Sequence, residues 1–444
     1  MADITVTVGG PAHGGWCVGR HEGRAVFVAG TLPGETVTAE VTERRSKLWF
    51  ARTVEVLEAS PDRIEHIWPL AAATGVGGAD LGHVALAAGR RWKAAVVATQ
   101  LRRMAHLDWD VTVEAAPGDA ARDGLAWRTR VEFTAGPDGR LGMFAPGSAR
   151  LVTVDSMPLA HEAIQAAAPW AGEYRPGDRV TVVRASAAPV VLTAAQDDTA
   201  TVAECVAVGE REYRYRLSAT GFWQVHREAP GVLVGAVLEG LGATVSGPVA
   251  VARTSLSSHR ARPHGPDTVS GPVAVAAGAS LSSHRARPHG PDTLPEGAIL
   301  DLYSGAGLFS VPLAERWPER RVVAVEGDPA GARWAAANLQ DYPRATAVHG
   351  DVARVLATSR AVPRRAAAVV LDPPRAGAGK AVVAAVAART PATVVFVACD
   401  PAAFARDVAL FATHGYALTA LRAFDLFPYT HHVECVGVLE RQPG

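Results

Sequence analysis

A cysteine and a glutamate are the side chains best suited to covalent chemistry in this sequence. Cys399 directly follows the apolar, strand-like run Val394 to Ala398 and precedes an Asp-Pro pair, and Glu434 lies further on in "FPYTHHVE". A thiolate is a strong nucleophile and a carboxylate can remove a proton, so this pair can support a covalent mechanism. Composition alone favours a packing role for a small cysteine. The position of Cys399 at a strand end favours catalysis instead.

A second group of residues has the pattern of a nucleoside-binding site. In "AILDLYSGAGLFS" a strand leads into a turn with Gly305 and Gly307, whose missing side chains let a ligand approach the backbone. Glu326 ends the next apolar run, 25 residues after Asp301, where a carboxylate can accept both ribose hydroxyls of an adenosine. Asp351 ends the third run and can reach an adenine amino group. Taken alone, Asp351 is equally well explained as a helix N-cap.

The phosphate-binding signatures are incomplete, so the predicted ligand is an adenosine without phosphates. Ser310 stands where the dinucleotide fingerprint has its third glycine, and no phosphate-binding lysine follows. After the fourth apolar run, "LDPPRAGAGK" places Asp372, Pro373 and Arg375 in a rigid loop, because two prolines cannot continue a strand ladder. These residues should lie beside Cys399, at the sheet edge where the strands end.

The elements that must position these residues belong to an α/β fold. From residue 294, apolar runs alternate with alanine-rich helical stretches, and the last two runs have no helix between them. This pattern predicts a parallel sheet with helices on both faces, closed by an antiparallel hairpin, over residues 294–444. Residues 1–60 contain short β-branched runs separated by turns, which predicts a five-stranded barrel of the oligonucleotide-binding type. Residues 61–240 read as a helix followed by a mainly β central domain.

Two further segments have a distinctive composition. Residues 83–107 show helical spacing with one apolar side, and the basic residues lie largely outside it: Arg90, Arg91, Lys93, Arg102 and Arg103. This arrangement favours a solvated face over a phosphate-contacting one. A tandem repeat starting at Ser246 and Ser270 fills most of residues 241–293. Its Pro/Gly/Ser/His/Arg-rich content lacks a core pattern and predicts a disordered loop without a metal site.

The bulk composition excludes several classes of protein. The chain has 444 residues with 44 Lys and Arg against 44 Asp and Glu, so its net charge is zero and only a local basic patch could attract a polyanionic partner. Its four cysteines form no CxxC pair, which argues against a disulfide framework or zinc site. There is no signal-peptide pattern and no run of 18 apolar residues. These features predict a cytoplasmic protein without a membrane span, and a monomer is the default expectation.

Taken in order, the motifs resemble those of the S-adenosylmethionine-dependent RNA (uracil-C5) methyltransferases. "DLYSGAGLFS", "LDPPR", "ACDPAAFARD" and "FPYTHHVE" match the ordered motifs of that family, and residues 9–41 resemble its RNA-binding TRAM domain. "GFWQVH" resembles the segment that contributes a cofactor-contacting glutamine, here Gln224. The resemblance implies a Rossmann-like methyltransferase domain, S-adenosylmethionine as cofactor, and tRNA or rRNA as substrate.

The resemblance also assigns roles to single residues. Cys399 would add to C6 of uracil, so that C5 can attack the methyl group, and Glu434 would then remove the C5 proton. The residues implied in cofactor binding are Gln224, Tyr303, Gly305, Gly307, Glu326, Asp351 and Asp372. Arg375 and Pro373 would contact the substrate base, and Asp372 could instead hold the uracil edge or order its loop. Cytosine-C5 methylation of RNA and a non-catalytic RNA-binding protein are the alternatives.

The sequence departs from the family pattern at two places. Many relatives carry an iron–sulfur cysteine motif after the barrel, whereas "RIEHIWPLAAATGVGGADLGH" contains no cysteine, so no cluster is predicted. Relatives commonly have Asn after the catalytic cysteine, and this chain has Asp400. A negative charge next to a thiolate tends to raise the pKa of the thiol.

Overall fold

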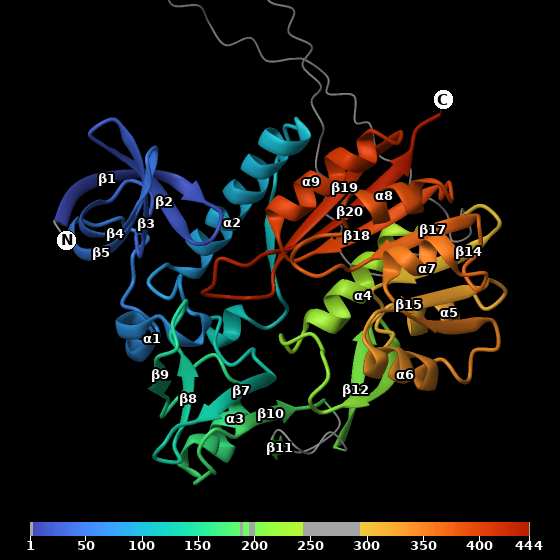
Figure 1. Cartoon of the computed structure of the whole chain (residues 1–444), viewed down its shortest axis with the longest axis horizontal. Coiled ribbons are helices and arrows are strands. Elements are labelled where there is room, and N and C mark those ends of the chain that lie inside the picture. The colour runs from blue at the N-terminus through green and yellow to red at the C-terminus, as the bar shows by residue number, and fades with distance from the viewer. Residues whose placement is uncertain (1–2, 187–189, 195–199, 243–293, 444) are drawn as a thin grey trace, which may run out of the picture.

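The computed structural model describes residues 3–186, 190–194, 200–242 and 294–443 (Figure 1). From residue 243 on, the loop predicted for residues 241–293 lies outside them. None of the helices in the described ranges is long and apolar enough to cross a membrane.

The N-terminal strands form a closed barrel. Their order is β1-β2-β3-β5-β4, and their bounds are β1 (Asp3–Ala12), β2 (Trp16–His21), β3 (Arg24–Ala29), β4 (Thr36–Arg44) and β5 (Leu48–Glu58). Side chains alternate along the strands, so that Ile4, Val6 and Val8 point into the barrel core while Thr5 and Thr7 face outward. The predicted five-stranded barrel is confirmed.

Helix α2 (Leu86–Gln100) connects the barrel to the rest of the molecule. Trp92 and Val96 belong to the barrel core, whereas Val97 and Leu101 belong to the core on one face of the C-terminal sheet. Lys93, which we expected largely outside the apolar side, is 1% exposed and donates to Asp425 and to the carbonyl of Phe427. The expectation was wrong because α2 is covered on two sides, and the carboxylate that compensates the buried charge is 332 positions away in the sequence.

The exposed basic side chains of this helical region form surface ion pairs. Arg91 pairs with Asp62, and Arg102 pairs with Asp108 just beyond α2, each between exposed side chains. This is the solvated face that the sequence pattern favoured.

The central region contains its own sheet and core. The sheet has the order β11-β10-β7-β8-β9, and large buried residues such as Trp127 and Phe133 fill the core beside it. Its strands are β7 (Arg130–Ala135), β8 (Leu141–Phe144), β9 (Leu151–Thr153), β10 (Arg179–Arg184) and β11 (Val190–Ala194). The accompanying short helices are α1 (Pro69–Thr74) and α3 (Glu162–Ala167).

The C-terminal sheet has eight strands in the order β16-β15-β14-β17-β18-β20-β19-β6. The first five are parallel, and β20 runs antiparallel to both β18 and β19. The strands are β14 (Ala298–Leu302), β15 (Val322–Glu326), β16 (Ala345–His349), β17 (Ala366–Leu371), β18 (Thr393–Ala398), β19 (Tyr416–Asp425) and β20 (Glu434–Arg441). The predicted α/β sheet with its closing hairpin is confirmed, and β6 (Val113–Ala115) adds an edge strand from the central region.

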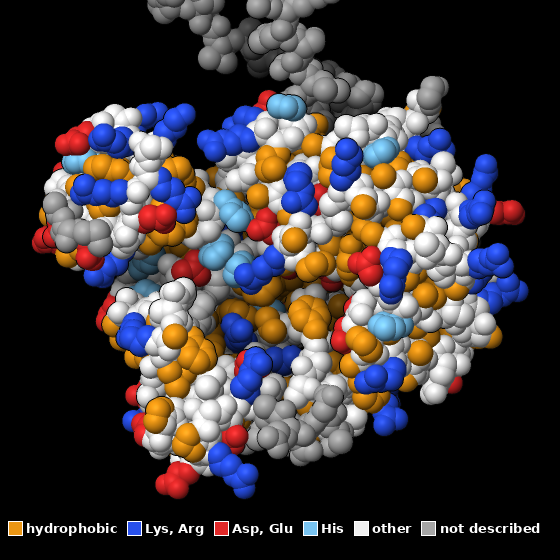
Figure 2. Space-filling model, in the orientation of Figure 1, with side chains coloured by type: hydrophobic (Ala, Val, Ile, Leu, Met, Phe, Trp, Pro, Cys, Tyr) orange, Lys and Arg blue, Asp and Glu red, His pale blue; other side chains and the backbone are white. Residues whose placement is uncertain are grey.

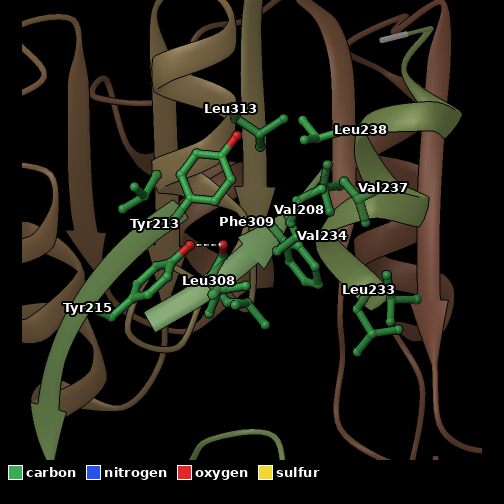
Figure 3. Close-up of a cluster of buried hydrophobic side chains, with 14 of the residues drawn as sticks. Val208, Tyr213, Tyr215, Leu233, Val234, Val237, Leu238, Leu308, Phe309 and Leu313 are labelled. Carbon is green, nitrogen blue, oxygen red and sulfur yellow. Dashed lines mark hydrogen bonds between the residues drawn. The ribbon is translucent and has the colours of Figure 1, made fainter. Parts of the chain in front are cut away.

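Helices cover both faces of this sheet (Figure 1). They are α4 (Ala229–Gly240), α5 (Ser310–Arg316), α6 (Pro329–Asn338), α7 (Val352–Thr358), α8 (Gly379–Ala387) and α9 (Pro401–Ala412). Residues of α4 and α5 share one core with the hairpin of β12 (Thr201–Val208) and β13 (Arg211–Ser218), as Figure 3 shows. Residues of α7, α8 and α9 fill the opposite core. Both faces are therefore closed, and the carboxyl ends of the parallel strands remain the place for a ligand.

Candidate active site

The turn after β14 is shaped to receive a ligand. Tyr303, Gly305 and Gly307 all have positive φ, at 65°, 55° and 91°. The backbone N–H groups of Tyr303 and Ser304 both donate to the carbonyl of Val325, at 2.8 and 3.1 Å, which ties the turn to the neighbouring strand β15. A β-carbon at Gly305 would meet no atom within 4 Å, so the turn faces open space.

Glu326 is held at the end of β15 by two backbone groups. One carboxylate oxygen accepts from the N–H of Gly305 and the other from the N–H of Asp328, both at 2.7 Å. Asp351 instead caps α7, because its Oδ1 accepts from the N–H of Arg354 at 2.9 Å. This is the N-cap arrangement that the sequence left open for Asp351, and its adenine contact stays a prediction.

Two buried polar atoms lie unsatisfied at this strand end. Within the described part of the chain, Oδ1 of Asp301 and Oγ of Ser304 have no hydrogen-bond partner, although Ser310 donates to the other oxygen of Asp301. Asp301 lies inside β14 and is completely buried. Burial raises the pKa of Asp301 to about 7, against the hydrogen bond from Ser310, and the charge of Glu326 adds to the rise.

A cluster of carboxyl groups continues across the strand ends. Burial, together with the charges of Asp301 and Glu326, raises the pKa of Asp372 to about 7. Glu434 is 2% exposed, and burial beside Asp372 raises the pKa of its carboxyl well above the ordinary range. Carboxyl groups whose ionisation is suppressed by burial and mutual repulsion are stabilised by a nearby cation. The cluster therefore fits the sulfonium and ammonium charges of the predicted cofactor.

Cys399 and Glu434 are brought together by the register of two antiparallel strands. Ala398 of β18 pairs with Cys435 of β20, and Val397 pairs with Val436. Continuing the same register by one step sets Cys399 directly opposite Glu434. Directly opposed residues point to the same face of a sheet with their β-carbons about 5 Å apart. The nucleophile and the base proposed from sequence are thus neighbours.

The thiol of Cys399 is protonated at neutral pH in this environment. Burial first, then the negative charges of Glu434 and Asp372, raise the pKa of the thiol to about 12. Arg375 acts in the opposite direction, and Asp400 adds a smaller rise. Formation of the thiolate therefore depends on positive charge near the strand ends.

Arg375 reaches the loop that leads into β20. Its guanidinium lies 3.2 Å from Nε2 of His432. Burial, with the neighbouring charges of His431 and Arg375, lowers the pKa of His432 to about 3, so its ring is neutral and Nε2 can accept from the guanidinium. Pro373, two residues before Arg375, is buried. The loop "LDPPR" and the loop "FPYTHHVE" are thereby joined beside Cys399.

Gln224 follows Trp223, which belongs to the core that α4 and α5 share with β12 and β13. The preceding Trp223 packs against Tyr215 with ring centroids 5.1 Å apart, and the hydroxyl of Tyr215 donates to the carbonyl of Leu308 at 2.8 Å, next to Gly307 (Figure 3). Gln224 is 9% exposed and lines a cavity of about 330 Å³ together with side chains of the central region. None of the strand-end residues lines that cavity. The cofactor contact of Gln224 remains a prediction.

The segment without cysteines is packed with apolar side chains. Trp68, Val76 and Ala79 are buried there, and a β-carbon at Gly77 would lie 1.9 Å from the ring of Trp68. Across the described ranges no group of three or more His, Cys, Asp or Glu residues could hold a metal ion.

Sequence reasoning missed two acidic–histidine contacts around the site. Nε2 of His13 lies 2.8 Å from Oδ2 of Asp400, and Nδ1 of His431 lies 2.7 Å from Oδ2 of Asp80. These pairs are separated by 387 and 351 positions, and no local motif signals either contact.

Comparison with known proteins gives matches along almost the whole chain. A family model described as tRNA (uracil-5-)-methyltransferase matches residues 362–442, and a TRAM domain model matches residues 2–54. An uncharacterized RNA methyltransferase of Bifidobacterium longum is 37% identical over 99% of this chain and 97% of its own length. The 23S rRNA (uracil(1939)-C(5))-methyltransferase RlmD of Chromohalobacter salexigens is 30% identical over 97% of this chain and 88% of its own length.

A solved structure shares the fold. The crystal structure of Pyrococcus abyssi tRNA (uracil-54, C5)-methyltransferase in complex with S-adenosyl-L-homocysteine aligns with 98% of this chain and 100% of that chain. The TM-score is 0.62 at 18% identity, a likeness that shows the fold alone. With relatives at 30% identity or more over nearly its full length, and with both family models in their expected places, the chain belongs to the family of RNA (uracil-C5) methyltransferases.

Proposed function

We propose that this enzyme transfers a methyl group from S-adenosylmethionine to C5 of a uridine in tRNA or rRNA, with Cys399 as nucleophile and Glu434 as base. The observation that carries the proposal is the pairing of Ala398 with Cys435 in β18 and β20, because Cys399 and Glu434 are the residues one step beyond that pair, at the ligand-binding edge of the sheet. The relatives with a printed substrate act on uracil C5 of RNA, which supports the choice of base.

The cofactor would lie along the strand ends, with its charged groups near the carboxyl cluster. Glu326 would accept the ribose hydroxyls, Tyr303 and the turn at Gly305 and Gly307 would lie against the nucleoside, and the orphaned Ser304 hydroxyl offers a further partner. When bound, S-adenosylmethionine supplies an electrophilic methyl carbon on a sulfonium. Its positive charge would also favour ionisation of Asp372, of Glu434 and of the Cys399 thiol.

Each bond change on the uracil can be assigned to a side chain. The thiolate of Cys399 forms a bond to C6, and the electron pair of the C5–C6 double bond moves onto the C4 carbonyl as an enolate. C5 would then take the methyl group as the bond between the methyl carbon and the sulfonium sulfur breaks and S-adenosylhomocysteine leaves as a neutral thioether, so that C5 carries both a methyl and a hydrogen. Glu434, as carboxylate, removes that proton, the C5–C6 double bond re-forms, and the C6–S bond breaks to release the thiolate. Arg375 and Pro373 would border the base, which must leave its stack to reach Cys399.

The proposal is tested by analysing nucleosides of total tRNA and rRNA from strains with and without the gene. Loss of 5-methyluridine at one position, restored by the wild-type gene and not by Cys399→Ala, is the expected result. Cys205, which lies on β12, offers a matched control, because Cys205→Ala should restore the modification. Unchanged 5-methyluridine in the deletion strain would refute the reaction. Loss of 5-methylcytidine instead would favour the cytosine alternative, and mapping the lost methyl group would separate tRNA from rRNA.

A further inference from the structure

The turn between β1 and β2 of the barrel reaches into the catalytic region. It consists of His13, Gly14 and Gly15, and the two glycines have φ angles of 88° and 83°. Figure 2 shows histidine side chains gathered in the hollow between the barrel and the rest of the molecule. The tip of a small RNA-binding barrel is thus placed beside the loops that carry the nucleophile and the base.

His13 binds the residue that follows the nucleophile. Its Nε2 lies 2.8 Å from Oδ2 of Asp400, while Oδ1 of the same carboxylate accepts from the N–H of Ala403 at 2.8 Å and caps α9. One carboxylate oxygen therefore fixes the start of the helix and the other is held by the barrel. Cys399 lies between the end of β18 and this doubly bound carboxylate.

Gly15 makes the second contact of the same turn. A β-carbon at this position would lie 2.8 Å from Oδ2 of Asp80 and 3.5 Å from Cβ of His431, so only glycine fits. Asp80 also accepts from the backbone N–H of His431 at 3.1 Å, three residues before Glu434. One turn of the barrel therefore touches the loops of both proposed catalytic groups.

The charges around Cys399 indicate how the contact between His13 and Asp400 affects formation of the thiolate. Glu434, Asp372 and Asp400 oppose formation of the thiolate, and Arg375 favours it. His13, hydrogen-bonded to Asp400, is a titratable side chain that carries a positive charge beside that carboxylate when it is protonated. The hydrogen bond to Asp400 raises the pKa of His13, although burial of His13 acts in the opposite direction. For Asp400, burial alone would raise the pKa, but the bonds from His13 and from the N–H of Ala403 outweigh burial and lower the pKa.

We propose that His13 is a positioning residue for methyl transfer, which holds the Cys399 loop through Asp400 and compensates the negative charge that Asp400 places beside the thiol. The inference rests on the proposed role of Cys399. It gives the barrel a part in catalysis in addition to any contact with RNA. It also explains how Asp400 is tolerated beside Cys399, since the charge that disfavours the thiolate is compensated by His13.

The test measures alkylation of Cys399 by iodoacetamide in the full chain as a function of pH, followed on its peptide by mass spectrometry. The variants are His13→Ala, His13→Gln, Asp400→Asn and the double variant, and His21→Ala is the matched control on the same barrel. The pair is partly exposed, with side chains 38% and 23% accessible, so its coupling is modest. We expect His13→Ala to slow alkylation about 3-fold near neutral pH, in the range of such pairs.

The alkylation rates of the four variants distinguish loss of the His13–Asp400 contact from a general structural effect. Asp400→Asn keeps a helix-capping side chain and removes the charge, so His13→Ala should have no further effect in that background. His13→Gln should restore part of the turnover number for methyl transfer but not the alkylation rate, because the amide can donate a hydrogen bond without a charge. His21→Ala should leave alkylation at the wild-type rate.

Two results would overturn the inference. One is wild-type alkylation and turnover in a folded His13→Ala protein. The other is an equal loss from His13→Ala with and without Asp400. The alkylation part of each result does not depend on the proposed reaction, because alkylation reads the thiol directly, whereas turnover does. A wild-type enzyme that forms no 5-methyluridine would refute the reaction and leave the alkylation result valid.

Discussion

Replacing Lys93 by methionine should destabilise the junction between α2 and the C-terminal hairpin. Lys93 and Asp425 are 1% and 3% exposed, and Lys93 also donates to the carbonyl of Phe427 at 2.9 Å. Methionine preserves most of the buried volume, so the main effect is the carboxylate left without its cation. Breaking such a buried pair costs about 3–5 kcal/mol, or more than a hundredfold in the unfolding equilibrium.

The matched control lies on the same helical region. Arg102 and Asp108 form an ion pair whose side chains are 63% and 67% exposed, and Arg102→Met should cost less than about 1 kcal/mol. Urea unfolding followed by tryptophan fluorescence measures both variants, with each transition fitted separately because a chain of several domains need not unfold in one step. The double variant Lys93→Met/Asp425→Leu removes both charges and should be more stable than Lys93→Met alone.

Equal losses in the free energy of unfolding from Lys93→Met and Arg102→Met would refute a special cost of the buried, unpaired carboxylate. A double variant as unstable as Lys93→Met would refute it too, because the loss would then come from packing and not from an unpaired carboxylate. A functional readout follows from the same contact. The loop after Phe427 leads to Glu434, so Lys93→Met should also lower the rate of methyl transfer.

Three further perturbations test the site and the barrel. Glu434→Gln should slow release of the product about 10²- to 10⁴-fold and leave RNA attached to the protein on a denaturing gel, and free RNA at the wild-type rate would contradict the assigned base. Glu35 is completely buried with bonds from Arg63, Leu32 and Ser60, so Glu35→Gln should lower the stability of the barrel by about 2 kcal/mol at neutral pH in thermal unfolding. Burial would raise the pKa of Glu35, but these bonds outweigh burial and lower the pKa. The stability that the Glu35 carboxylate contributes is therefore full above the ordinary pKa of 4.5 and is lost as the pH falls through the pKa of the folded state. A Glu35→Gln barrel that loses as much stability in acid as the wild type would count against this role. Gly77 has a φ of 79° and a β-carbon there would lie 1.9 Å from the ring of Trp68, so Gly77→Ala should lower the melting temperature, whereas Gly89→Ala inside α2, whose β-carbon meets nothing within 4 Å, should not lower it.

The strand-end residues could be predicted because their signals are local. The glycine-rich turn at Gly305 and Gly307, the acidic residue closing β15 and the cysteine closing β18 each follow an apolar run, and parallel strands bring such ends to one edge. The pairing of β20 with β18 could not be predicted in this way, because the hairpin of β19 and β20 does not say which of its strands lies beside β18. Asp351 shows the limit of this reasoning, because a carboxylate at a strand end caps the next helix as readily as it meets a ligand.

Contacts between distant parts of the chain could not be predicted in the same way. Lys93 reads as a surface residue until Asp425 is known to lie against it, and nothing near His13 indicates that it meets Asp400. The three-residue strand β6 is too short to give a period, yet it extends the C-terminal sheet. In each case the deciding partner is more than 300 positions away in the sequence, where helical and strand periodicity carry no information.

The placement of α2 has a consequence for how the chain reaches its folded state. The barrel and α2 leave the ribosome early, but the carboxylate that neutralises Lys93 belongs to β19, near the end of the chain. Until residues 425–427 have emerged, the ammonium group of Lys93 lacks the two groups to which it donates in the folded protein, and the side of α2 that they cover is exposed. The N-terminal part can therefore complete its docking only after synthesis is nearly finished, and a chain that ends before β19 keeps one side of α2 open to solvent and to chaperones.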